Sequence, residues 1–279
     1  MANLTYYKQA PLPFVGQKRM FLKHLKQVLN HIPDDGEDWI IVDAFGGSGL
    51  LSHFAKHHKP KARVIYNDFD GYTERLQHIA EINQLRQILA ELLVGVPKGK
   101  RLGKAKKLQV IAAIEAFEGY KDPHILCSWL LFSGQQVRTL DELYQKDFWH
   151  CLRKSDYPLA NGYLDGIEVV SESFHSLLPK YTDNPKALFV LDPPYLCTHQ
   201  ESYKQANYFD LVDFLRLVHL TRPPYIFFSS TKSEFVRFID AMIEDKWENW
   251  HAFEDYKRIA VNVSANYSGK YEDNIVFKF

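Results

Sequence analysis

Hydrophobic and polar residues follow one another in blocks that are typical of alternating strands and helices. Short apolar runs end in an acidic residue at 39–43 (WIIVD) and at 62–68 (ARVIYND), and the segment 50–58 between them has a helical pattern. Residues 71–95 then carry apolar side chains at helical spacing. Strand, tight turn, helix and strand make a βαβ unit, which implies a parallel sheet and a right-handed crossover.

The same rhythm returns in the second half of the chain. Three further strands are predicted at 166–172, 187–192 and 225–230, with helices near 209–220 and 232–245.

The C-terminal residues have a different pattern. The stretches YKRIAVNV (256–263) and DNIVFKF (273–279) are predicted to form an antiparallel hairpin that closes the edge of the sheet. The pattern therefore predicts an α/β fold with a doubly wound, mostly parallel seven-stranded sheet that ends in an antiparallel hairpin.

The middle of the chain interrupts this order. Residues 98–107 (KGKRLGKAKK) contain six basic residues in ten, helical stretches follow around 105–118 and 123–133, and 155–166 are rich in turn residues. We interpret residues 96–165 as a mostly helical inserted lobe. Residues 1–95 and 166–279 then form one α/β domain.

Amino-acid composition favours a globular protein over a membrane-spanning or secreted one. Apolar residues make up 46% of the 279 residues, which is enough for a substantial core, and no apolar run reaches the roughly 18–20 residues that span a bilayer. The N-terminus has no signal-peptide pattern, and three widely spaced cysteines fit a reducing cytosol, so we expect a cytoplasmic protein. No metal-ligand spacing is present. Because 34 basic residues balance 34 acidic ones, net charge does not indicate a nucleic-acid partner, although a local basic patch can.

A glycine turn follows the first predicted strand, in VDAFGGSG (42–49). Gly46, Gly47 and Gly49 allow a sharp bend and the close approach of a ligand, toward which the N-terminus of the next helix points. The order of glycines matches neither the dinucleotide fingerprint nor a P-loop. Asp68 ends the next strand, where an acid can accept hydrogen bonds from ribose hydroxyls. The alternative is a tight turn with an aspartate that caps a helix.

The segment DPPY (192–195) ends a predicted core strand with an acid, two prolines and an aromatic ring. Pro193 and Pro194 fix the backbone, so that the Asp192 carboxylate and the Pro193 carbonyl become two rigid acceptors. Two acceptors suit an –NH₂ group, and Tyr195 adds a flat face for stacking on a planar ring. The segment therefore indicates a clamp for an aromatic amine, and the alternative is a proline-stiffened loop with an incidental acid.

These motifs and their order resemble the Dam-like group (D12 class, alpha group) of S-adenosylmethionine-dependent DNA adenine-N6 methyltransferases. PLPFVGQKRMF (11–21) is similar to that group's N-terminal cofactor motif, DAFGGSG to its glycine motif, YNDFD to its ribose-binding stretch and the C-terminal residues to its closing hairpin. The resemblance covers both ends of the chain and implies a Rossmann-like methyltransferase fold. The cofactor-binding residues that it implies are Phe14, Lys18, Asp43, Phe45, Gly47, Gly49, Asp68 and Asp192.

Three positions depart from the group's pattern. Gln17 replaces the second glycine of the N-terminal motif, and Ala44 replaces the usual proline of the glycine motif. Ser173 stands where the group has an aspartate associated with the cofactor adenine, and the neighbouring Glu172 is a candidate substitute.

The resemblance implies a site-specific DNA methyltransferase of the kind found in DNA methylation and restriction-modification. Its partner is double-stranded DNA, its cofactor is S-adenosylmethionine, no metal or membrane is needed, and the protein is a monomer or a weak dimer. Asp192 and the Pro193 carbonyl would localise the lone pair on adenine N6, and the base would leave the duplex to reach them. The catalytic residues are then Asp192, Pro193, Pro194 and Tyr195. Alternatives are a cytosine-N4, RNA or protein-glutamine methyltransferase, or an inactive DNA-binding relative.

Two segments of the lobe are candidate DNA contacts. Lys98, Lys100 and Arg101 are placed to grip phosphates, with a solvated basic linker as the alternative. Further along the chain, Gln135, Gln136 and Arg138 are residue types that read base edges, and the alternative is a polar helix end.

Overall fold

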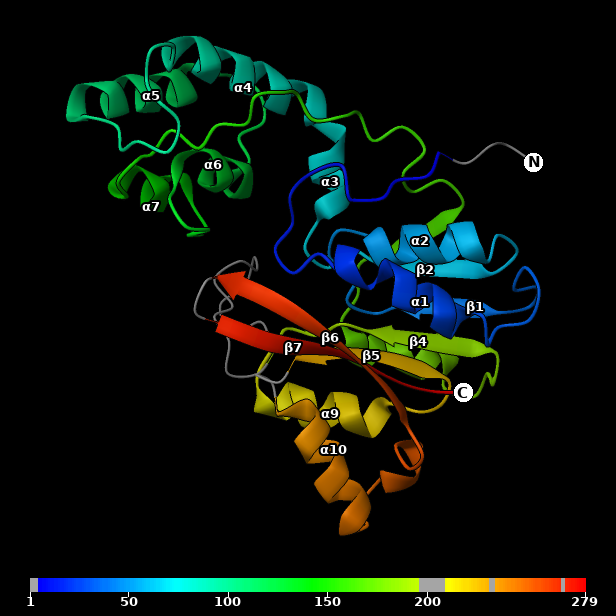
Figure 1. The fold of residues 1–279 in the computed structure, drawn as a ribbon. Helices are drawn as coiled ribbons and strands as arrows, with labels where there is room; N and C mark the ends of the chain where they lie inside the picture. Colours follow the sequence, from blue (N-terminus) through cyan, green and yellow to red (C-terminus); the bar gives the residue numbers. More distant parts are fainter. Residues whose placement is uncertain (1–4, 196–208, 231–233, 267–268) are drawn as a thin grey trace.

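One mixed sheet organises the protein, and the computed structural model describes residues 5–195, 209–230, 234–266 and 269–279. Its strand order is β3-β2-β1-β4-β5-β7-β6 (Figure 1). The strands are β1 (Ile40–Asp43), β2 (Arg63–Asn67), β3 (Ile167–Val170), β4 (Ala187–Leu191), β5 (Tyr225–Ser230), β6 (Lys257–Asn266) and β7 (Gly269–Lys278).

The first five strands are parallel, and the last two form the antiparallel part. Strand β7 runs antiparallel to both β5 and β6, so the C-terminal hairpin extends the parallel sheet with β6 outermost. This confirms the predicted mostly parallel seven-stranded sheet and its closing hairpin, and each strand lies where the apolar runs placed it.

Helices cover both faces of the sheet, and alternate strand residues contribute to the two layers. Leu188 and Val190 of β4 pack with α1 (Leu22–Leu29) and α2 (Leu50–His58). Phe189 and Leu191 pack on the opposite face with α9 (Leu211–Leu220) and α10 (Phe235–Glu244). A strand that is apolar at every position is thus explained by burial on both faces. Shorter helical segments complete these layers, namely η1 (Arg19–Phe21), α8 (Phe174–Leu177), η2 (Leu178–Tyr181) and η4 (Trp250–Ala252).

A separate group of helices stands away from the sheet at one end of the molecule (Figure 1). It contains α4 (Ile79–Leu92), α5 (Lys104–Ala116), α6 (Pro123–Leu130) and α7 (Leu140–Gln145), and α3 (Tyr72–Gln77) connects it to the sheet. These helices share a core with Trp129 and Phe148 fully buried, and Leu12 of the N-terminal segment joins that core.

Some elements differ from the predictions. The helix expected over residues 71–95 is two helices, because His78 leaves the helical conformation with φ −99° and ψ 13° between α3 and α4. Helices α1 and α7 were not predicted. Part of the expected helix at 232–245 and part of the hairpin connection lie outside the described residues.

Candidate functional site

Three aspartates meet at the carboxyl edge of the sheet. Asp43 is the last residue of β1, Asp68 follows β2 and Asp192 follows β4. Strand β1 lies between β2 and β4, with Asp43 in register with Tyr66 and Val190. The parallel order therefore brings together three carboxylates that are far apart in the sequence, at the edge where open α/β sheets bind ligands.

The glycine turn connects this edge to the N-terminal segment. Gly47 and Gly49 have φ values of 50° and 70°, which favour glycine. A Cβ on Gly47 would lie 2.9 Å from the Phe14 ring, so only glycine allows that ring to pack so closely. The Tyr66 hydroxyl fixes the turn from below by donating to the Gly47 carbonyl at 2.7 Å. Two of the predicted cofactor motifs are thus in direct contact.

Asp43 is fully buried beneath this turn. Its Oδ2 accepts a hydrogen bond of 2.7 Å from the Ser52 hydroxyl, whereas Oδ1 has no hydrogen-bond partner among the residues that the structure describes. Burial, with a further contribution from the nearby Asp192 carboxylate, raises the pKa of Asp43 from 3.8 to about 7. An unsatisfied carboxylate oxygen in this position suits a ligand that brings an N–H donor or a positive charge.

Asp192 is held by Lys18. The Lys18 ammonium lies 2.8 Å from Asp192 Oδ2 and donates to the Gly16 carbonyl at 2.9 Å. The same ammonium lies 5.2 Å from the centre of the Tyr195 ring. Only 10% of the Lys18 side chain and 15% of the Asp192 side chain are exposed. Burial raises the pKa of Asp192, and the Lys18 charge partly opposes that rise.

The Lys18 ammonium occupies the position beside Asp192 and Tyr195 that a bound amine would take. A nitrogen that carries N–H donors lies between a carboxylate acceptor and an aromatic ring, and Pro193 and Pro194 are buried behind that carboxylate. An amine from the protein itself thus contacts the acid of the predicted clamp, and the action of that clamp on a substrate amine stays a prediction. Sequence reasoning placed Lys18 near the cofactor and did not anticipate this ion pair.

Asp68 has a structural role. Its carboxylate accepts hydrogen bonds from the backbone N–H groups of Tyr72 (2.6 Å) and Thr73 (2.8 Å) at the start of α3. The hydroxyls of Thr73 and Tyr66 also donate to it. Asp68 is thus the helix-capping aspartate considered as the alternative, and its predicted contact with ribose stays a prediction.

The remaining cofactor candidates line the same edge. The Phe45 ring packs against Phe174 and Phe209, with ring centres 5.4 Å and 5.8 Å away. The Glu172 carboxylate forms an ion pair of 2.5 Å with Lys180, and Ser173 is the N-cap of α8. Glu172 is thus a partly exposed acid beside the departure at Ser173.

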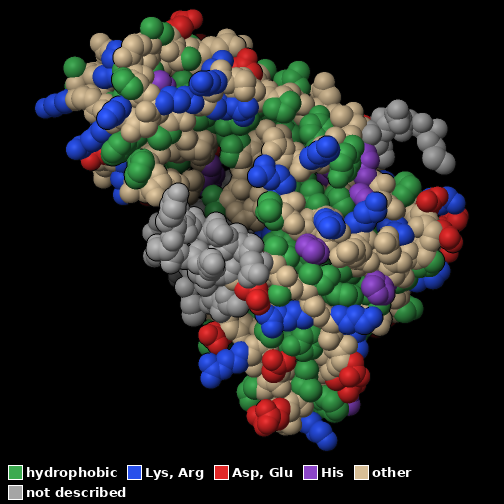
Figure 2. All heavy atoms as spheres, viewed as in Figure 1, with side chains coloured by type: hydrophobic (Ala, Val, Ile, Leu, Met, Phe, Trp, Pro, Cys, Tyr) green, Lys and Arg blue, Asp and Glu red, His purple; other side chains and the backbone are tan. Residues whose placement is uncertain are grey.

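The predicted DNA contacts fall into two groups on the lobe. Lys98, Lys100 and Arg101 are exposed, and the Arg101 guanidinium forms an ion pair of 2.5 Å with Asp147. Figure 2 shows Lys and Arg side chains gathered over the lobe on the face drawn there.

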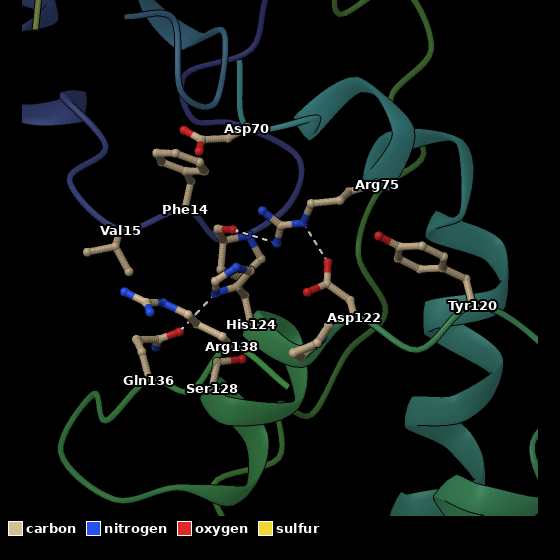
Figure 3. Close-up of a pocket in the computed structure, with 12 residues that line it drawn as sticks. Phe14, Val15, Asp70, Arg75, Tyr120, Asp122, His124, Ser128, Gln136 and Arg138 are labelled. Carbon is tan, nitrogen blue, oxygen red and sulfur yellow. Dashed lines mark hydrogen bonds and ion pairs between the residues drawn. The ribbon is translucent and has the colours of Figure 1, made fainter. Parts of the chain in front are cut away.

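The second group lies partly against the N-terminal segment. Gln135 is exposed, whereas Gln136 and Arg138 line a cavity together with Phe14 of the N-terminal segment (Figure 3). Sequence reasoning missed the ion pair that supports this cavity, between Arg75 and Asp122, with 2.5 Å between Nε and Oδ2. The dipeptide Asp122–Pro123 carried a readable signal, because an N-cap acid followed by proline at N1 typically begins a helix.

Among the residues that the structure describes, no helix is long and apolar enough to cross a bilayer. Those same residues contain no cluster of three or more His, Cys, Asp or Glu side chains that would hold a metal ion.

Comparison with known proteins gives one strong sequence match. A Haemophilus influenzae protein described as "Putative methyltransferase" is 65% identical over 281 aligned positions, which cover all of this chain and 95% of that protein. A crystal structure described as a "putative rRNA-methylase" from Clostridium thermocellum aligns over 92% of this chain and 97% of that chain. Its TM-score is 0.35 and its sequence identity 11%, values too low to support any argument. No protein-family model matches the chain.

Proposed function

Because this chain belongs to the same methyltransferase family as its Haemophilus influenzae relative, we propose that it transfers a methyl group from S-adenosylmethionine to adenine N6 in double-stranded DNA. The observation that carries the proposal is the Lys18 ammonium between Asp192 and Tyr195. This contact supports a role for the end of β4 in accepting a nitrogen donor beside a flat ring.

The charge of the site supports the proposed cofactor. S-adenosylmethionine carries positive charge on its sulfonium and its ammonium, and it supplies the methyl group. Three carboxyl groups lie at one sheet edge, and Asp43 has an oxygen with no hydrogen-bond partner among the described residues. A cation bound there would favour the charged form of Asp43. We propose that the cofactor is held by the set predicted from the sequence, namely Phe14, Lys18, Asp43, Phe45, Gly47, Gly49, Asp68 and Asp192.

The chain's own residues then have defined tasks in the reaction. Lys18 leaves Asp192 when the target amino group arrives, and the Asp192 carboxylate accepts a hydrogen bond from that group. A carboxylate acceptor draws the N–H bonds toward itself, which opposes delocalisation of the lone pair into the ring and raises nucleophilicity at N6. Tyr195 stacks on the base, while Pro193 and Pro194 keep the acceptor from moving.

The assignment to DNA rests on the motif order and on the lobe. We propose that residues 96–165, together with α4, which shares their core, recognise the target. The rest of residues 1–95 and residues 166–279 would form the catalytic domain. Lys98, Lys100 and Arg101 would contact phosphates, and Gln135, Gln136 and Arg138 would face bases.

A labelled-methyl assay tests this function. Duplex DNA, single-stranded DNA and RNA are each incubated with protein and labelled S-adenosylmethionine, then digested to nucleosides and separated. We expect the label in N6-methyldeoxyadenosine from duplex DNA. Label in N4-methyldeoxycytidine or only in RNA would contradict the substrate, and no transfer to any of them would contradict nucleic-acid methylation.

A further inference from the structure

A cavity of about 250 Å³ lies between the N-terminal segment and the lobe (Figure 3). Phe14 and Val15 line it on one side, and Tyr120, His124, Gln136 and Arg138 of the lobe line it on the other. None of the three carboxylates at the sheet edge is among its lining residues. It is therefore distinct from the amine site, and Phe14 separates it from the glycine turn, because the Phe14 ring also packs against Gly47.

The cavity is rigidly supported. The Arg75 guanidinium pairs with Asp122 at 2.5 Å and donates to the Pro13 carbonyl at 3.1 Å, with both charged side chains less than one-tenth exposed. Asp122 also caps α6 by accepting from the Ile125 N–H at 3.1 Å. The Arg75 guanidinium thus connects the N-terminal segment to the lobe, and the Asp122 carboxylate neutralises its charge. The floor of the cavity is preformed and does not itself attract an ion.

The polar groups at its rim are mostly donors. The Arg138 guanidinium forms no ion pair with any residue that the structure describes, and only its backbone N–H is used, by Glu142. The Gln136 Oε1 lies 3.3 Å from His124 Nδ1, which leaves the Gln136 amide N–H groups available to donate. Phe14 provides a flat face, whereas one face of the Tyr120 ring is already stacked on His78, with ring centres 4.3 Å apart. A planar wall with donors at the rim fits an aromatic heterocycle that has adjacent acceptors.

We propose that this cavity binds one guanine of the nucleic-acid substrate, other than the methylated base, and reads its O6 and N7 through Arg138 and Gln136. Guanine is the base with two acceptors on one edge, the arrangement that arginine contacts with two parallel hydrogen bonds. This inference rests on the proposed action on nucleic acid.

The guanine would lie close to the target base. Val15 lines the cavity, and Lys18, three residues later, contacts Asp192. Three residues span at most about 11 Å of extended chain, so the two sites are separated by a few nucleotides at most. Arg138 and Gln136 therefore determine sequence preference beside the methylated position.

The test uses full-length protein and a set of DNA duplexes in which each position around the target base is varied. Binding is measured with a non-reactive cofactor analogue, and methyl transfer is measured on the same duplexes. We expect a preference for guanine at one position, about five- to hundredfold, the range of one bidentate contact. Replacing that guanine by 7-deazaguanine, which lacks N7, removes most of the preference. In Arg138→Ala the preference is lost and the 7-deaza change has no further effect.

Gln145→Ala is the matched control, because Gln145 is an exposed glutamine of α7 in the same group of helices and does not line the cavity. It keeps the guanine preference, whereas Gln136→Ala weakens it. Retention of the preference in Arg138→Ala, or no preference for guanine in the wild type, overturns the inference. If guanine-dependent binding is present and no DNA is methylated, the proposed function fails and the cavity assignment stands.

Discussion

The buried carboxyl of Asp43 makes a quantitative prediction about stability. Its pKa is about 7 in the folded protein, against 3.8 ordinarily, so the fold binds this proton more tightly than the unfolded chain does. The stabilisation that comes with the neutral carboxyl is complete below pH 4 and is lost as the pH rises through 7. The folded and unfolded pKa values of Asp43 differ by about three, and each pKa unit corresponds to about 1.36 kcal/mol. The free energy of unfolding therefore falls by about 4 kcal/mol in total, of which about 3 kcal/mol is lost between pH 5 and pH 8.

Asp43→Asn removes the titrating group and leaves an oxygen for the Ser52 hydroxyl. Its free energy of unfolding is measured by urea titration at pH 5, 6, 7 and 8. We expect the value to fall furthest below that of the wild type at pH 5, and to approach or exceed the wild-type value at pH 8. Asp141→Asn, at an exposed aspartate of α7, is the control and should preserve the wild-type pH dependence. Identical pH dependence in Asp43→Asn and wild type would refute the reasoning about burial.

Three other outcomes follow from the site and the lobe. Lys18→Met should move the acidic limb of the kcat/KM profile, which reports the free enzyme, to higher pH, because the Lys18 charge lowers the pKa of Asp192; an unmoved or lowered limb would contradict this. Asp68→Ala should lower the free energy of unfolding by about 1–2 kcal/mol, the usual cost of a lost helix cap, and calorimetry with S-adenosylmethionine on the same variant tests the ribose prediction separately. Replacing Lys98 and Lys100 by Ala should flatten the log–log salt dependence of duplex binding by about 0.9 per lost phosphate contact, and an unchanged slope would support a solvated linker.

The sheet could be predicted because each strand carries its own local signal. Continuous apolar runs ending in acids located β1, β2 and β4, and the structure shows that the parallel order brings those acids to one edge. The break at His78 could not be predicted, since apolar spacing continues across it and only the local backbone conformation ends α3.

The sequence indicated which residues belong to the candidate site, but it did not indicate which of them contact one another. Asp192 and Tyr195 were identified because an acid, two prolines and a ring at the end of a core strand together form a rigid acceptor beside a flat face. The ion pair between Lys18 and Asp192 depends on how the N-terminal segment crosses the sheet edge, which no local pattern encodes. For the same reason the cavity beside Phe14 emerged only from the packing of the lobe against that segment.

The central claim is that the Asp192 carboxylate activates an exocyclic amine, and single-turnover methyl transfer by Asp192→Asn tests it most directly. The amide preserves the shape of the side chain and replaces a charged acceptor with a weaker one. With protein saturated by S-adenosylmethionine and bound to duplex DNA, we predict that the rate of N6-methyldeoxyadenosine formation falls by about a hundredfold or more, the scale of losing one preorganised electrostatic contact. A rate equal to that of the wild type under the same conditions would contradict the account.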